Sequence, residues 1–261
     1  MCKSEPVFTF GSFMDRLIEG RNFVFVRFSD GELEVLKNRE LVIAEGKTQF
    51  RGEGFSNDFD KHDSKVYIPN KMDSLRRDLL ASLVHRSDNY IKGIPSAHVS
   101  AEIDQDYCLR MNGGMDDNIT YADLLINWNY GKFRDKFIPY VCASDKNVVV
   151  IANENSVVDK LFNINKLITV PSNFFPEYAT EKSRVIEEID SLEPESIILS
   201  SASSLSNVLG HYVSSNNLGH TFVDVGSAIN PYLGFGSTAR EFLQSNGKPY
   251  ISHFGYSNYE W

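Results

Sequence analysis

The segment RFSDGEL, residues 27–33, places two carboxylates two residues apart directly after an apolar run, NFVFV. Carboxylate oxygens that leave a strand together are typical ligands of a hard divalent cation such as Mg²⁺ or Mn²⁺. We therefore predict that Asp30 and Glu32 bind such a cation. The alternative is structural: Asp30 caps the following helix, and Glu32 lies in its first turn, where acids are favourable. The residues of this turn that we predict to contact a cofactor are Arg27, Ser29 and Gly31.

A second segment, SIILSSASSLSN (196–207), combines a short apolar run with a turn of small residues and the start of a helix-like pattern. Small side chains let a ligand approach the backbone, and the first N–H groups of a helix bind phosphate well. We therefore predict that Ser203 and Ser204 contact a diphosphate. Capping of the helix by serine explains the same pattern without a ligand.

Acids also follow two other apolar runs. Glu154 follows NVVVIAN (147–153), and we predict it as a general base for a sugar hydroxyl or as an acid that binds ribose, with Asn153 beside it as a cofactor contact. An acid at the start of a helix is the alternative for Glu154. Asp224 lies in the run HTFVDV (220–225) and is the second candidate base.

The segment VDVGSAINPYLGFGSTARE (223–241) contains glycines that permit tight turns. We predict Gly226 and Ser227 as cofactor contacts and Arg240 as the partner of a phosphate or carboxylate. The first residues of the segment are also similar to the D-x-G loop of methyltransferases, although here they follow the last predicted strand. A structural turn rich in glycine is the alternative.

These segments need a scaffold that brings the ends of several strands together. Short runs rich in β-branched residues predict strands at 22–28, 89–94, 147–152, 166–170, 196–200 and 220–225. Amphipathic segments predict helices at about 30–38, 71–86, 132–143, 156–163, 177–191 and 203–217. Strands that alternate with helices form a mostly parallel sheet covered on both faces, and ligands bind beyond the carboxyl ends of its strands.

The predicted fold class is therefore α/β: Rossmann-like, with a mostly parallel sheet and helices on both faces. We expect a single domain over residues 1–261, with its most regular, Rossmann-like half at about 147–241. Residues 95–130 are rich in Gly, Asn and Asp, and we predict a long loop region there with a short helix at 121–128.

The composition disfavours several classes of protein. With 26 basic and 35 acidic residues the chain has a net charge of −9, which argues against binding of nucleic acid. Every apolar run falls short of the roughly 20 residues that cross a bilayer, so we expect a cytoplasmic protein with peripheral membrane association at most. The three cysteines are far apart and the six histidines show no metal-binding spacing, so we predict neither disulfides nor a histidine-based metal site.

Several of these segments together resemble a bacterial family, the GT-D glycosyltransferases, first known as a domain of unknown function. RFSDGEL resembles the family's R-F-G-D-G-E signature, VVVIANENSVV its strand ending in N-E-N-A, and FVDVGSAINPY its D-[VI]-G-S-[AS]-[LI]-[DN]-P segment. VPSNFFPEY and IILSSASSLSNVLGHYV are similar to two further pieces, and the shared order spans about residues 22–241. The sequence departs from the pattern at Ser29, where glycine is usual, and at Asn230, where aspartate is common.

The resemblance implies a Rossmann-like fold distinct from the two commonest glycosyltransferase architectures. It also implies metal-dependent transfer from a nucleotide-sugar, with Asp30 and Glu32 holding Mn²⁺ or Mg²⁺ and a UDP-sugar as the expected donor. The implied acceptor is a glycan, glycoprotein or lipid-linked sugar in polysaccharide assembly, and a homo-oligomer is compatible with the sequence.

Questions of mechanism and class stay open at this point. Glu154 or Asp224 supplies the base if the reaction inverts the anomeric centre, whereas a retaining reaction needs no such base. Two alternative functions also remain: a non-catalytic nucleotide- or sugar-phosphate-binding module, and an S-adenosylmethionine methyltransferase.

Overall fold

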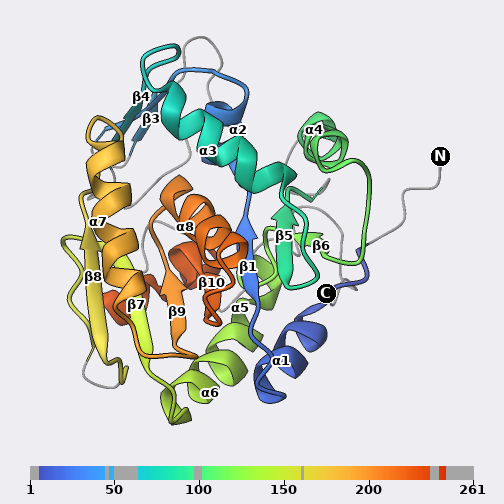
Figure 1. The fold of residues 1–261 in the computed structure, drawn as a ribbon, viewed down its shortest axis with the longest axis vertical. Coiled ribbons are helices and arrows are strands. Elements are labelled where there is room, and N and C mark those ends of the chain that lie inside the picture. Colours follow the sequence, from blue (N-terminus) through green and yellow to red (C-terminus); the bar gives the residue numbers. More distant parts are fainter. Residues whose placement is uncertain are drawn as a thin grey trace.

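The computed structural model describes residues 6–44, 47–49, 64–96, 102–159, 162–235 and 241–244. Within them a central sheet of seven strands runs through the molecule (Figure 1), in the order β6-β5-β1-β10-β9-β7-β8. Every neighbouring pair in this sheet is parallel. The strands are β1 (Val24–Arg27), β5 (Tyr90–Ile94), β6 (Ile119–Tyr121), β7 (Val148–Asn153), β8 (Lys166–Val170), β9 (Ile197–Ser200) and β10 (Thr221–Asp224). The expected α/β class is confirmed, and six of these seven strands are the predicted ones.

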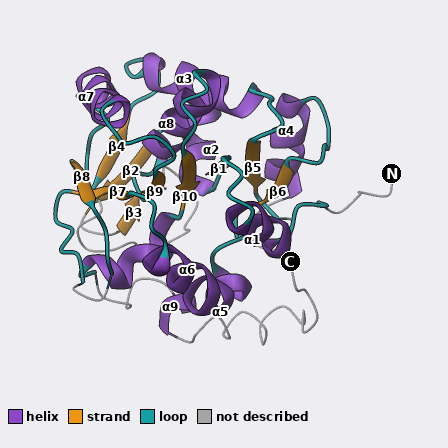
Figure 2. Ribbon diagram, turned by 60° about the horizontal axis from the view of Figure 1, so that its bottom comes forward, coloured by secondary structure: helices purple, strands orange, loops and turns teal. Residues whose placement is uncertain are grey.

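Helices cover both faces of the sheet (Figure 2). Side chains of β1 alternate between two cores, as expected for a strand buried on both faces. Val24 and Val26 join the core that includes residues of α3 (Asp73–Val84), α7 (Tyr178–Asp190) and α8 (Ser204–Ser215). Phe25 joins the core that includes residues of α1 (Phe10–Ile18) and α6 (Ile138–Ala143). The remaining helical segments are α2 (Asp30–Leu36), α4 (Glu102–Asn112), α5 (Tyr130–Lys132), α9 (Glu241–Gln244), the 3₁₀ segments η1 (Asn127–Asn129) and η3 (Gly226–Leu233), and the π-helical η2 (Phe133–Phe137).

A small antiparallel sheet, which the sequence analysis did not predict, lies between α2 and α3 in the chain. Its strands are β2 (Leu41–Ala44), β3 (Lys47–Gln49) and β4 (Lys65–Tyr67), in the order β3-β2-β4. The Val66 N–H donates to Asn173 Oδ1 at 3.2 Å, and the Tyr67 ring packs edge-on against Phe175 at 6.4 Å between centroids. These contacts fix the small sheet to the loop that follows β8, at the carboxyl end of the main sheet.

Two predicted helices and one predicted loop region were wrong. The region 95–130 contains helix α4 and strand β6, and the short helix predicted at 121–128 is a turn followed by η1. Residues 156–159 of the predicted helix 156–163 are not helical. Their backbone bonds instead to η3, with Val157 N donating to Leu233 O at 2.9 Å and Asp159 N to Tyr232 O at 2.8 Å. This tertiary pairing explains why a helix does not form.

None of the helices among these residues has the length and apolar character that crossing a bilayer requires.

Candidate active site

The acid pair lies in the first turn of α2, immediately after β1. Ser29 is the N-cap, Asp30 is the first helical residue and is exposed, and Glu32 is the third and is only 8% exposed. The Ser29 N–H donates to Glu32 Oε2 at 3.1 Å, as in a capping box. The structural alternative was therefore wrong for Asp30, because Ser29 occupies the cap, and partly right for Glu32, which supports the helix start.

Glu32 lies among other acids. Burial and, to a smaller extent, the charges of Asp224 and Asp30 together raise the pKa of Glu32 from 4.5 to about 7, against the lowering effect of the Ser29 N–H and of Arg27. Its second oxygen, Oε1, accepts a long hydrogen bond of 3.5 Å from Ser203 Oγ, at the start of α8. The carboxylates of Asp224 and Asp30 thus outweigh the opposing charge of the Arg27 guanidinium near Glu32.

Asp224 and Arg27 join the ends of β10 and β1. The Arg27 backbone N–H donates to Asp224 Oδ2 at 3.2 Å, the Gly226 N–H donates to Oδ1 at 3.0 Å, and Arg27 Nε lies 3.6 Å from Oδ1. Burial raises the pKa of Asp224, and Arg27 opposes this shift. Both oxygens therefore already accept hydrogen bonds, which favours a positioning role for Asp224 over the predicted role as a base. Arg27, which the sequence predicted as a cofactor contact, pairs with this acid.

Gly226 is required by the position of Arg27. Its φ of +47° lies in the left-handed region, and a Cβ at this position would lie 1.7 Å from Arg27 Nη2. Gly226, which was predicted as a cofactor contact, thus packs against the guanidinium of Arg27. Ser227 follows in η3 and is half-buried.

The start of α8 reaches the same edge of the sheet. Ser203 is its N-cap, with φ +51° and ψ −143°, a conformation that is strained for serine. Ser204 is buried, and its Oγ has no hydrogen-bond partner among the described residues. Asn207 Nδ2 donates to the Arg27 carbonyl at 2.7 Å and so fixes α8 to the end of β1. The first turn of this twelve-residue helix therefore lies beside the acid pair.

Glu154 and Asn153 lie on a different part of this edge. Because β10 and β9 separate β1 from β7, Glu154 is three strand spacings, roughly 14 Å, from the end of β1. Glu154 is exposed, and its Oε1 accepts from the Ser172 N–H at 3.2 Å, while Asn153 Nδ2 donates to Ser172 Oγ at 2.5 Å. No helix begins at Glu154 in the described segment 154–159, so that alternative was wrong.

Two further predicted cofactor contacts are Gly31 and Arg240. Gly31 is half-buried in the first turn of α2, and Arg240 lies outside the described residues.

One acid was missed: Asp123, which is 4% exposed and follows β6. Burial raises the pKa of Asp123 to about 6, against hydrogen bonding by Asn127 and the charge of Arg27. Asp123 lies in the segment 121–128, where the sequence predicted a short helix, and no local pattern marked it as a site residue.

Across the described residues, no three or more His, Cys, Asp or Glu side chains form a group able to hold a metal ion. Any metal held by Asp30 and Glu32 would therefore need further ligands from a substrate or from water. Such a ligand set is ordinary for Mg²⁺, which commonly binds one or two carboxylates together with substrate phosphates.

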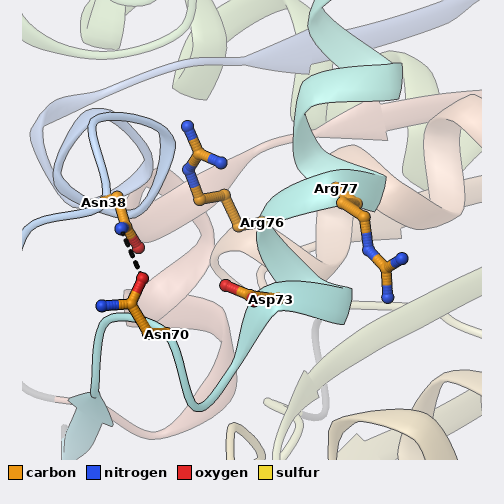
Figure 3. A pocket seen from close by; sticks show the side chains of 5 residues that line it. All are labelled: Asn38, Asn70, Asp73, Arg76 and Arg77. Atoms are coloured by element: carbon orange, nitrogen blue, oxygen red, sulfur yellow. Dashed lines mark hydrogen bonds between the residues drawn. The ribbon is translucent and has the colours of Figure 1, made fainter.

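A separate pocket of about 360 Å³ lies at the other end of α2, lined by Asn38, Asn70, Asp73, Arg76 and Arg77 (Figure 3). The side chains of Arg76 and Arg77 leave α3 in different directions, and Arg76 Nε donates to the carbonyl of the last residue of α2 at 3.0 Å. The two guanidinium groups do not converge, so this pocket is not built to bind an anion between them.

The fold and this edge define a class of protein: an α/β protein with a Rossmann-like parallel sheet and an acid pair directly after a strand near its centre. Solved structures with the same fold include one described as "A New Glycosyltransferase (DUF1792) from Streptococcus sanguinis", with a TM-score of 0.57 and 16% identity over 94% of this chain and 87% of the other. Another, described as "The highly conserved domain of unknown function 1792 has a distinct glycosyltransferase fold", has a TM-score of 0.58 and 12% identity over 93% and 82%. A selenomethionine-substituted structure of domain of unknown function 1792 has a TM-score of 0.56 and 13% identity over 93% and 82%.

No protein-family model and no curated protein matches the sequence. Identities of 12–16% establish a shared fold and no more. The resemblance to the GT-D family that the motifs indicated is therefore confirmed at the level of the fold.

Proposed function

We propose that this protein is a metal-dependent glycosyltransferase that moves a sugar from a nucleotide-sugar, with UDP-sugars as the expected donors, to a glycan or polysaccharide acceptor. The observation that carries the proposal is Glu32: a buried carboxylate beside two other acids and a helix N-terminus, at the carboxyl edge of this fold. Solved structures with the same fold are described as glycosyltransferases, which supports the same reading.

The acid pair fits a divalent cation. Asp30 and Glu32 supply hard oxygen ligands, and a bound cation would stabilise the charged form of Glu32, which burial and the neighbouring acids Asp224 and Asp30 disfavour. When bound, Mg²⁺ or Mn²⁺ would act as a Lewis acid for the charge that develops on a leaving diphosphate. Arg27 and Asp224 would then hold the end of β1 in place without touching the substrate.

The neighbouring elements suit the rest of a nucleotide-sugar. The first turn of α8, at Ser203 and Ser204, offers backbone N–H groups to the diphosphate. Farther along the edge, on the side of β7 and β8, Glu154 and Asn153 offer polar groups suited to ribose hydroxyls. This position favours the nucleoside-binding role predicted for Glu154 over its role as a base.

The test is hydrolysis and transfer with a panel of UDP-sugars in the presence of Mn²⁺, for the wild type and for Asp30→Asn and Glu32→Gln. Loss of a ligand to a catalytic cation should lower turnover at least about 100-fold. Glu34→Gln is the matched control, because Glu34 lies on the same helix but faces Arg39 at 3.6 Å. Full turnover in both ligand variants would exclude the metal assignment, and metal-dependent UDP binding without turnover would identify a binding module instead.

A further inference from the structure

The chains that leave β5 and β6 carry two buried polar side chains at the carboxyl edge of the sheet, on the side of β1 away from β10. The β5–β6 ladder pairs Ile94 with Tyr121, and the Ala122 N–H still donates to the Ile94 carbonyl at 2.8 Å. Ser96 and Asp123 follow directly, so both leave the carboxyl edge of the sheet where the two chains are still held together.

Gly93 allows the chain after β6 to lie close over the end of β5. A Cβ at Gly93 would lie 3.0 Å from Ala122 Cα and 3.1 Å from the Tyr121 carbonyl oxygen. The same approach lets Arg27 Nη1 donate to the Ala122 carbonyl at 3.2 Å. Asp123 is thereby brought near Arg27, whose backbone and side chain in turn contact Asp224.

Both side chains hold unused hydrogen-bonding capacity. Ser96 is 2% exposed and Asp123 is 4% exposed, yet Ser96 Oγ and Asp123 Oδ2 have no hydrogen-bond partner within the described part of the chain. A buried polar atom without a partner is unfavourable, so native proteins hold few of them. Ser82 shows the usual arrangement, because its buried Oγ bonds both to Tyr90 OH at 2.7 Å and to the Asn207 carbonyl at 2.9 Å.

We propose that Ser96 and Asp123 bind hydroxyl groups of the sugar that is transferred. This inference rests on the proposed function and adds the sugar subsite to it. A carboxylate oxygen only accepts and a serine hydroxyl both donates and accepts, a combination that suits neighbouring sugar hydroxyls. The strand order then lays the donor along one edge: nucleoside beyond β7, diphosphate at α8 and the acid pair, and sugar beyond β5 and β6.

The test compares binding of UDP with binding of a UDP-sugar. Calorimetry with Mn²⁺ would use UDP and whichever of UDP-glucose, UDP-galactose and UDP-N-acetylglucosamine the wild type binds most tightly. For Asp123→Asn and Ser96→Ala we expect UDP affinity within about twofold of wild type and UDP-sugar affinity lower by about 10-fold. Unchanged UDP-sugar affinity in both variants, with UDP still bound, would overturn this inference alone. If the wild type bound no UDP with Mn²⁺, the proposed function would fail and this inference with it.

Thermal unfolding separates a binding role from a structural one. Removal of an unpartnered buried group should leave the Tm of Asp123→Asn and Ser96→Ala unchanged or higher. The matched variant Ser82→Ala loses two hydrogen bonds, so it should lower the Tm and leave the UDP-sugar affinity unchanged. If Ser96→Ala and Asp123→Asn lowered the Tm as much as Ser82→Ala does, both groups would be structural and the inference would be wrong.

Discussion

Glu32 should make the metal-free protein less stable as the pH rises, the reverse of what a salt-bridged carboxylate does. Its pKa is raised from 4.5 to about 7 in the folded state, so the folded protein binds this proton more tightly than the unfolded chain. Below about pH 4.5 both states are protonated, and Glu32 contributes nothing to pH dependence. Between about pH 4.5 and 7 the unfolded state ionises first, so stability falls as the pH rises, and above pH 7 the full penalty is present.

The size of the penalty follows from the same values. A pKa difference of about 2.5 corresponds to about 3 kcal/mol. Glu32→Gln removes the charge and keeps an oxygen that can accept from the Ser29 N–H. We therefore expect the variant to be more stable than the wild type by about 3 kcal/mol at pH 8 in EDTA, equivalent to roughly 6–12 °C in Tm, and nearly equal to it at pH 4.

The assay is thermal and urea unfolding at pH 4 and pH 8, in EDTA and in Mn²⁺. Mn²⁺ at 100 times its Kd should stabilise the wild type by about 2.7 kcal/mol at pH 8 and should stabilise Glu32→Gln much less. Glu187→Gln, at an exposed position of α7, controls for the general effect of removing an acid. If Glu32→Gln is no more stable than the wild type at pH 8 in EDTA, then burial and the neighbouring acids do not disfavour the charged form of Glu32, and Glu32 has no need of a cation.

Two further substitutions test the packing of the fold. Gly226→Ala should lower the free energy of unfolding by about 4 kcal/mol, because its Cβ displaces Arg27 from a buried ion pair. The control Gly219→Ala, also at positive φ but with open space around it, should lower it by only about 1 kcal/mol. Equal losses in urea unfolding would contradict the role of Gly226 in making room for Arg27. Lys92→Met should lower the free energy of unfolding by about 2–4 kcal/mol, because buried Lys92 donates to two backbone carbonyls and an asparagine side chain. The surface control Lys136→Met should change it by no more than about 0.5 kcal/mol. If Lys92→Met left the free energy of unfolding unchanged, these carbonyls would have found other donors.

The parts of the fold that local sequence determines were predictable. Runs such as NVVVIAN and KLITV are rich in β-branched residues, and each became a strand within a residue or two of the prediction. The strands that were missed are short: β3, β4 and β6 have three residues each, and β2 has four. So few residues give too little alternation to distinguish a strand from a loop, and their conformation is fixed by neighbouring strands.

The candidate site was predictable in its position more than in the roles of its residues. The acid pair could be identified because Asp30 and Glu32 are neighbours in the chain. The engagement of Asp224 by Arg27 could not, because the contact joins residues 197 apart. Asp123 was missed for the same reason, since only the pairing of β6 with β5 brings it to this edge.

The pairing of β1 with β10 also has a consequence for the order of folding. The two strands lie side by side near the middle of the sheet, although residues 28–220 separate them in sequence. During synthesis the side of β1 that pairs with β10 therefore stays unpaired until β10 has left the ribosome, and contacts of such long range form slowly. Nascent chains that end before residue 221 would expose this unpaired strand edge, which favours aggregation during expression.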